Sequence, residues 1–173
     1  INYYGTPDQF SKITIGLNNT PFTNATVNYI MPFEYTVLDE TAQTIAITGL
    51  NTNYPHKENI TIPSTYNGYT VVQIGDGTSP VSNLNNVKTI TISDGIETIA
   101  SNAFSGYTNI ENITFPTTLT SLESGALTGC TNLKNLDLSN TSITSTSGTF
   151  SGYSFIESIK LPNNMTALSG GSL

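Results

Sequence analysis

The chain has 173 residues, of which 36% are hydrophobic and only 10% are charged, and its formal net charge is −7 at pH 7. This length and apolar share are enough to build one hydrophobic core. The negative charge argues against nucleic acid and anionic membrane surfaces as partners. No run of residues approaches the roughly 20 apolar residues of a membrane-spanning helix, so membrane insertion is not expected either.

Residues 1–32 predict a short helix followed by a short strand. Thr6 is a suitable N-cap, Pro7 suits the first helical position, and Gln9 completes a capping box, so we expect a helix to begin here. A loop should end it, and residues 26–29 are predicted to form a brief strand that stops before Pro32.

The next segment predicts two strands that each bury one face. Phe33, Tyr35 and Val37 alternate with other residues, and so do Ile45 and Ile47. Alternation with a period of two is typical of half-buried β-strands. We therefore expect a pair of strands at the start of this segment.

A hairpin is predicted shortly afterwards. Ile60-Thr61-Ile62 has the same pattern as Ile90-Thr91-Ile92 further along the chain. The intervening residues include Asn67-Gly68, a dipeptide that tolerates the positive φ angles of a tight hairpin turn. Residues 33–79 are therefore interpreted as an irregular β-hairpin unit that caps the chain following it, and we call them the capping unit.

From residue 80 onward the sequence repeats itself. Apolar residues stand at the first, fourth and sixth places of four segments that follow one another at a constant step of 23: Val87–Ile92, Ile110–Phe115, Leu133–Leu138 and Ile156–Leu161. A fixed period in the twenties with this pattern is typical of a leucine-rich-repeat solenoid, in which each unit buries its apolar face against its neighbours. Residues 80–173 are predicted to form such repeats within a mostly β fold with short helices and turns. We expect the array to be truncated inside its last repeat, either as a fragment or with its open end covered by another chain.

The second half of each repeat has its own periodic positions. One apolar column consists of Val81, Phe104, Leu127 and Phe150, and a glycine expected to form a turn recurs as Gly106, Gly129 and Gly152. The third unit departs from the pattern, because Ser145 falls where Ile99 and Leu122 stand in the units before it. This unit is expected to be the least well packed on its outer side.

Catalysis is poorly supported by the sequence. The only histidine, His56, has no second metal ligand at a suitable spacing and no nucleophile motif nearby, so we interpret it as a solvated loop residue. The acidic pair Asp39-Glu40 is interpreted as solvated charge in a turn. Cys130 shares a column with Leu84 and Tyr107, which predicts a buried apolar position. We expect no enzyme activity, cofactor or metal.

The outward side chains of the repeated strands are the first candidates for contact with a partner protein. They include no aromatic residue and no arginine, the types that supply many binding hot spots. Beside them, the charge alternates in sign from one unit to the next, which predicts a structural charge ladder of Lys88, Glu111, Lys134 and Glu157. The candidate contact column consists of Thr91, Thr114, Asp137 and Lys160.

Tyrosines gather in the capping unit instead. Tyr54, Tyr66 and Tyr69 are predicted at loop or turn positions, where their rings would be available to a partner protein. The alternative interpretation is that these rings simply pack over the first strand.

The ordered set of repeat motifs resembles a known family. Ile96-x-x-Ile99 followed by Ser101-Asn102-Ala103-Phe104-Ser105-Gly106-Tyr107, and Phe115-Pro116 with Leu119 and Leu122, resemble the BspA-like leucine-rich repeats. Cys130 stands where that family often has cysteine. Residues 1–32 resemble a segment that closes an upstream repeat block, and the capping unit resembles one that opens a new block, as in proteins of Gram-positive bacteria.

The resemblance implies a secreted or surface-anchored bacterial protein that uses its repeats for adhesion or protein contact, for example with a host extracellular protein. One alternative is a structural spacer that projects other domains from the cell surface. A second is a glycan-binding accessory segment, although the exposed aromatic platforms that sugars usually need are not evident. Glycosylation-like triplets occur at Asn18, Asn24, Asn59, Asn112, Asn140 and Asn164, and a chain so rich in Asn, Ser and Thr produces them by coincidence.

Overall fold

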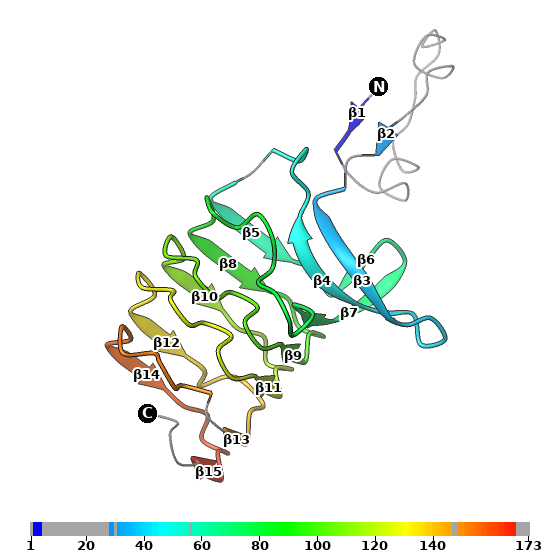
Figure 1. The fold of residues 1–173 in the computed structure, drawn as a ribbon. Helices are drawn as coiled ribbons and strands as arrows, with labels where there is room; N and C mark the ends of the chain where they lie inside the picture. The colour runs from blue at the N-terminus through cyan, green and yellow to red at the C-terminus, as the bar shows by residue number, and fades with distance from the viewer. Residues whose placement is uncertain (1, 5–27, 30, 56, 147–148, 169–173) are drawn as a thin grey trace, which may run out of the picture.

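The computed structural model describes residues 2–4, 28–29, 31–55, 57–146 and 149–168. Within these ranges the fold is mostly β and contains no helix. Successive turns of the chain stack on one another as the rungs of a β-solenoid (Figure 1). The predicted solenoid is therefore confirmed, whereas the helix expected to begin at Thr6 lies outside the described residues.

One side of the solenoid is a row of short parallel strands, one from each rung (Figure 1). Their register places Ile90 between Ile60 and Ile113, and places Leu136 beside Ile159. Ile90 is fully buried and Leu136 is 1% exposed, so this column forms the apolar ladder that the repeat predicts. The strands are β5 (Asn59–Ile62), β8 (Thr89–Ile92), β10 (Asn112–Thr114), β12 (Asn135–Asp137) and β14 (Ser158–Lys160).

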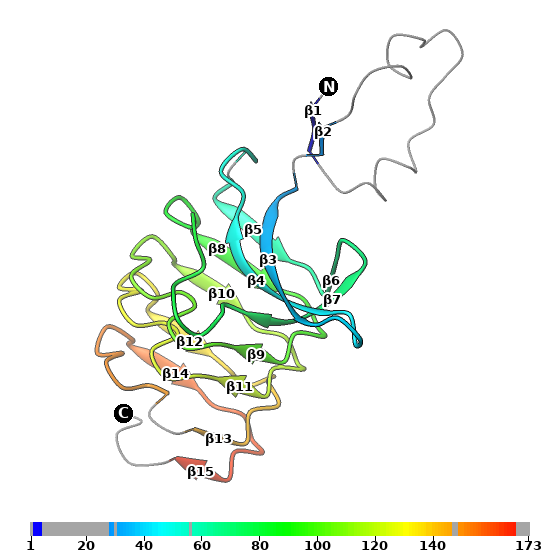
Figure 2. The ribbon, with the colours of Figure 1, turned by 45° about the vertical axis from the view of Figure 1, so that its right-hand side comes forward.

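The other side carries a second row of strands, which Figure 2 shows beside the first. Its main sheet has the order β11-β9-β7-β4-β3, with β6 paired to β7, and the pair β13-β15 continues the row. The capping unit therefore shares a sheet with the first repeats. The pair β1-β2 lies apart from it, near the N-terminus (Figure 1). The bounds are β1 (Asn2–Tyr3), β2 (Asn28–Tyr29), β3 (Phe33–Asp39), β4 (Thr44–Leu50), β6 (Thr65–Tyr66), β7 (Tyr69–Ile74), β9 (Thr98–Ile99), β11 (Ser121–Leu122), β13 (Ser145–Thr146) and β15 (Ala167–Leu168).

Strand β4 is more deeply buried than its sequence predicts. Ile45, Ala46 and Ile47 are all 0% exposed, so side chains on both faces of the strand are covered. β4 is hydrogen-bonded to β3 on one side and to β7 on the other, so it is an interior strand of its sheet rather than an edge strand. The prediction of a half-buried strand is wrong here, because alternation alone does not tell how much chain will cover the second face.

The predicted hairpin is confirmed. Asn67 and Gly68 have φ angles of 52° and 85° and connect β6 to β7, which pair antiparallel with Tyr66 opposite Tyr69. Two consecutive positive φ angles match the right-handed twist of the flanking strands.

Side chains also join each rung to the one before it. The Tyr107 hydroxyl donates a hydrogen bond to the Val81 carbonyl (2.5 Å), and the Cys130 thiol donates to the Phe104 carbonyl (3.0 Å). Cys130 is fully buried, and burial raises the pKa of its thiol to about 12, so it stays protonated and able to donate. The prediction of a buried Cys130 is confirmed.

The third unit is irregular in a different way from that predicted. Thr146, not Ser145, lies in register with Leu168, and Thr146 is 5% exposed whereas Ser145 is exposed. Compared with the unit before it, this unit has one more residue ahead of the strand and one fewer after it, so Phe150 returns to its column. The inward side chain is thus a threonine, where Ile99 and Leu122 stand in the rungs before it.

Both rows of backbone hydrogen bonds are interrupted between the second and third units, since β10 and β12 fall in separate sheets, as do β11 and β13. One backbone hydrogen bond remains across this junction, from the Ser142 amide to the Leu119 carbonyl (2.9 Å), and side-chain hydroxyls supply further bridges. Ser142 Oγ donates to the Thr117 carbonyl (2.7 Å), Thr149 Oγ1 donates to the Leu122 carbonyl (3.1 Å), and the Tyr153 hydroxyl accepts from the Leu127 amide (2.9 Å). We call this boundary the seam.

The recurring glycines do form turns, as predicted. Gly106, Gly129 and Gly152 have φ angles of 82°, 80° and 82°, a region that side chains with a Cβ rarely adopt. A Cβ on Gly129 would lie 3.3 Å from the backbone of Gly106, whereas a Cβ on Gly152 would meet nothing within 4 Å. Glycine is thus required at Gly129 for conformation and also for the close approach of two rungs.

Tyr66 anchors the capping unit to its first strand. Its ring packs edge-on against Phe33 with centroids 5.5 Å apart, and its side chain is in the core at 5% exposure. The Tyr66 hydroxyl accepts a hydrogen bond from the Phe33 amide (2.9 Å) and donates one to the Phe33 carbonyl (3.1 Å). Burial raises the pKa of this phenol from 10.0 to about 12.

We expect Gly129→Ala to lower the free energy of unfolding more than Gly152→Ala. Both substitutions place a Cβ in a left-handed conformation, at a cost of about 1–2 kcal/mol. Gly129→Ala must also move Gly106 away, which adds about 1–3 kcal/mol if neighbouring rungs are forced apart. Urea unfolding of the two variants measures the difference, and equal values would show that the approach of the rungs does not constrain this position.

Tyr66→Phe should lower the free energy of unfolding by about 1–3 kcal/mol at neutral pH, since it leaves two backbone groups of Phe33 without their partner. The raised pKa means that the folded state holds the phenol proton more tightly than the unfolded state. The stabilisation that the Tyr66 phenol contributes is complete below pH 10 and is lost as the pH rises towards 12. Thermal melts from pH 9 to pH 11.5 should fall less steeply for Tyr66→Phe than for the wild type, and parallel curves would contradict this role.

Candidate protein-binding surfaces

The outward side of the strand row, which we call the strand face, collects the predicted contact column. Side chains alternate along each strand, so the residues flanking the buried isoleucines and leucines point outward. Thr91 lies in register with Thr114, and Asp137 with Lys160, and all four are exposed. The structure therefore brings these four predicted residues to one polar surface.

Asp137 and Lys160 form an ion pair across β12 and β14. Lys160 Nζ donates to Asp137 Oδ2 at 2.8 Å, and Ser139 donates to the other carboxylate oxygen from both its hydroxyl and its amide. These donors lower the pKa of Asp137 to about 2, with Lys160 the largest cause. The pair is exposed, so it fixes the position of two side chains on the face and adds little stability.

The predicted charge ladder begins one rung earlier than the sequence indicates. Lys88 Nζ lies 3.0 Å from Glu58 Oε1, and this hydrogen bond raises the pKa of Lys88. Lys134 lies 3.9 Å from Glu157 further along the same column. Glu58 precedes β5 just as Lys88 precedes β8, but the hairpin inserted between these two strands breaks the regular period that would have revealed it.

The tyrosines of the capping unit do not share one environment. Tyr66 is a core residue in β6, so the prediction of an available ring at a loop or turn position is wrong for it. Tyr69 lies in β7, half-buried, and its hydroxyl donates to Glu40 (3.3 Å). Tyr54 is half-buried in a loop and packs edge-on against the exposed Tyr4 with centroids 6.0 Å apart. Tyr54 and Tyr69 therefore remain at the surface, and Tyr66 does not.

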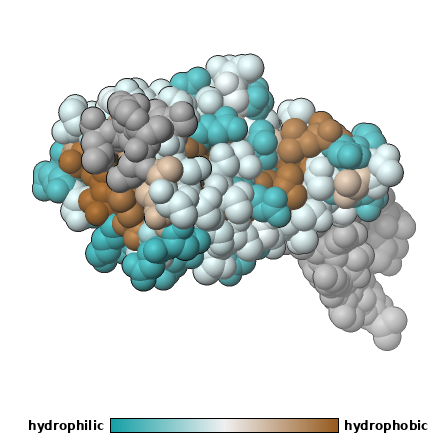
Figure 3. Space-filling view, turned by 90° about the horizontal axis from the view of Figure 1, so that it is seen from below, coloured by the Kyte–Doolittle hydropathy of each residue, from teal (hydrophilic) through white to brown (hydrophobic). Residues whose placement is uncertain are grey.

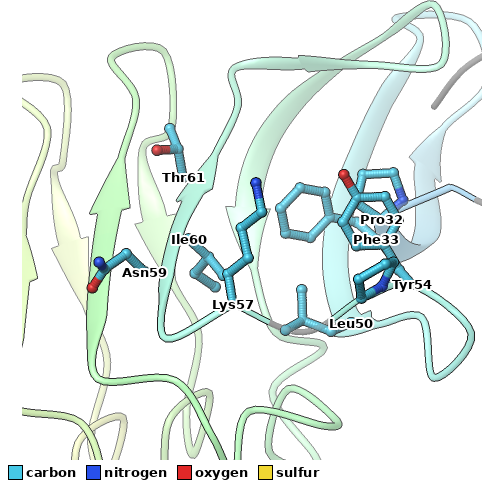
Figure 4. Close-up of a pocket in the computed structure, with 9 residues that line it drawn as sticks. Pro32, Phe33, Leu50, Tyr54, Lys57, Asn59, Ile60 and Thr61 are labelled. Atoms are coloured by element: carbon cyan, nitrogen blue, oxygen red, sulfur yellow. The ribbon is translucent and has the colours of Figure 1, made fainter. Parts of the chain in front are cut away.

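A groove opens beside Tyr54, between strand β5 and the start of β3 (Figure 4). Its volume is about 300 Å³. Pro32, Phe33 and Leu50 line it on one side, and Asn59, Ile60 and Thr61 of β5 line it on the other. The sequence did not reveal this groove, because its walls come from segments that are brought together only by the fold.

The residues weighed for chemistry are dispersed. Asp39 caps its own turn by accepting hydrogen bonds from the amides of Thr41 and Ala42, and Glu40 is exposed. Across the described ranges, no three His, Cys, Asp or Glu side chains gather closely enough to hold a metal ion. His56 lies outside those ranges. The described part also holds no helix that could cross a membrane.

Comparison with solved structures shows the same fold in bacterial proteins. The leucine-rich repeat protein of T. pallidum is 18% identical, with 82% of this chain and 80% of that chain covered and a TM-score of 0.52. A leucine-rich cell surface protein of Faecalibacterium prausnitzii is 22% identical, with 79% of this chain and 43% of that chain covered and a TM-score of 0.50. A leucine-rich repeat protein of Bacteroides ovatus is 20% identical, with 84% and 49% covered and a TM-score of 0.51. This chain thus spans less than half of the last two.

Sequence comparison agrees with the geometry. A search of curated proteins finds no match to this sequence. The family model for the BspA type leucine rich repeat region, however, matches residues 77–173 in six copies, which is more than half of the chain. Figure 3 shows the molecule from below, with hydrophobic residues reaching the surface at the C-terminal end of the solenoid. Ile156 and Ile159 of the last described rung are half-buried and stand at the positions that point inward in earlier rungs. The repeats, their register and the family match together show that this chain belongs to the BspA type leucine-rich repeat family.

Proposed function

We propose that this chain is a non-enzymatic module of a bacterial surface or secreted protein, and that it binds a host extracellular protein through the strand face. The observation that carries the proposal is the parallel register of the strands, which fixes exposed polar side chains at regular spacing on one surface. Paired strands lie roughly 4.8 Å apart on each side of the seam, so each part of the face offers a partner a rigid grid with little entropy to lose on binding.

The chemistry of the face favours a polar partner surface. Thr91 and Thr114 offer hydroxyl groups on two rungs, and the Asp137–Lys160 pair offers both charges on the next two. Asn112, Asn135 and Ser158 add exposed amide and hydroxyl groups beside them. A surface of this kind suits hydrogen bonding to another protein through many small contacts rather than through one aromatic anchor.

The capping unit extends this surface at its first rung. Tyr54 and Tyr69 keep part of their rings exposed, and tyrosine supplies a large contact area at a small cost in side-chain entropy. We propose that residues 33–79 act as a unit that opens the repeat block and contributes these rings to partner contact, whereas Tyr66 serves only the core.

Thr114→Arg tests the proposal at the centre of the strand face. An exposed substitution of this kind should change the free energy of unfolding by no more than about 0.5 kcal/mol. It places a long charged side chain over the grid, so binding to a protein captured from a panel of purified extracellular ectodomains should weaken by at least about tenfold in Kd. Thr131→Arg makes the same change at an exposed turn away from the strands and should leave binding unchanged.

Two outcomes would contradict the proposal. If no ectodomain in the panel binds the wild type, the alternative of a structural spacer is favoured. If an ectodomain binds and tolerates Thr114→Arg as well as Thr131→Arg, the contact lies elsewhere on the molecule. A glycan array run in parallel addresses the remaining alternative, that of a carbohydrate-binding segment.

A further inference from the structure

Strand β5 has one free edge. Among the described strands, β5 pairs only with β8, and it is the end strand of its sheet. The carbonyl groups of Glu58 and Ile62 accept hydrogen bonds from that neighbouring rung. Residues of a parallel strand turn their backbone groups to opposite sides in alternation, so the amide and carbonyl groups of Asn59 and Thr61 face the open side.

The open side of β5 is the groove described above. Asn59, Ile60 and Thr61 line it directly, together with Phe33 and Leu50 across from them. Phe33 and Leu50 are 9% and 5% exposed and belong to the core, so the groove has an apolar floor. Backbone groups on an open strand edge and an apolar floor beside them are the two features that an added β-strand uses, the first for affinity and the second for side-chain selection.

A positive charge stands at the mouth of this groove. Figure 4 shows the Lys57 side chain extended between Ile60 and Phe33. Lys88, Lys134 and Lys160 each lie within 4.0 Å of a carboxylate, whereas Lys57 is the one lysine of the described ranges with no such partner. The groove therefore complements a ligand that carries a carboxylate.

We propose that the groove beside β5 binds an extended, acidic peptide segment of a partner protein. The segment adds as a strand to the edge formed by Asn59 and Thr61, places an apolar side chain over Phe33 and Leu50, and pairs a carboxylate with Lys57. This site lies at the edge of β5 rather than on the outward side of the strands. Tyr54 borders the groove and also belongs to the first proposal, so the two are told apart by Lys57→Glu, which changes the groove, and Thr114→Arg, which changes the strand face.

The test uses a phage-displayed library of random heptapeptides selected on the whole chain. Enriched peptides should share a carboxylate and a β-branched or aromatic residue, and Lys57→Glu should weaken their binding by at least about tenfold in Kd. Lys134→Glu makes the same charge change on a distant rung and should leave the Kd within about twofold, a change too small to signal a lost contact. Each peptide is synthesised with a free and with an amidated C-terminus, which separates a terminal carboxylate from a side-chain carboxylate.

A second measurement follows the backbone contacts. The backbone nitrogens of the peptide can be methylated in two alternating sets, and methylation of one set should abolish binding whereas methylation of the other should not. Bound peptide should also slow amide hydrogen exchange at Asn59 and Thr61. The proposal is overturned if no peptide is enriched, if enriched peptides bind Lys57→Glu as well as the wild type, or if protection appears on other strands. If sedimentation shows concentration-dependent dimers and the same amides are protected in them, the groove binds a second copy of this chain and not a peptide.

Discussion

The whole molecule depends on one constraint: a rung cannot bury its own apolar side chains and must rest against the rungs beside it. Ile90 is completely buried only because Ile60 and Ile113 lie on either side of it in register. The same condition applies on the outer side, where Val81, Phe104 and Leu127 are covered in turn by the next rung. Packing between neighbours therefore sets the register, and the register in turn places the polar groups of the strand face.

This constraint explains why the repeats were predictable. Each rung buries apolar residues at the same positions, so the constant period of the sequence predicted the buried columns as well as the repeat length. The positive φ of Gly129 and the burial of Cys130 followed from their columns for the same reason. The four outward residues of the candidate column could be assigned to one face because strands alternate.

What could not be predicted lies where the period fails. The hairpin inserted after β5 separates Glu58 from Lys88 by more than one period, which hid an ion pair that the regular spacing would have exposed. In the third unit, a gain and a loss of one residue cancel, so Phe150 stays in its column while Thr146 replaces Ser145 in another. Tyr66 and the groove beside β5 depend on contacts between segments far apart in the chain, and local pattern carries no information about these.

The seam has a consequence for how the solenoid would unfold under force. Elsewhere, neighbouring rungs are joined by backbone groups that every residue possesses, so substitution seldom removes such a bond. At the seam, apart from the bond from the Ser142 amide to the Leu119 carbonyl, the joining groups belong to the side chains of Ser142, Thr149 and Tyr153, and a substitution that removes one of these hydroxyls would erase its bond. A chain under tension along its long axis would part there first, leaving the capping unit with its rungs as one cooperative block and the final rungs as another.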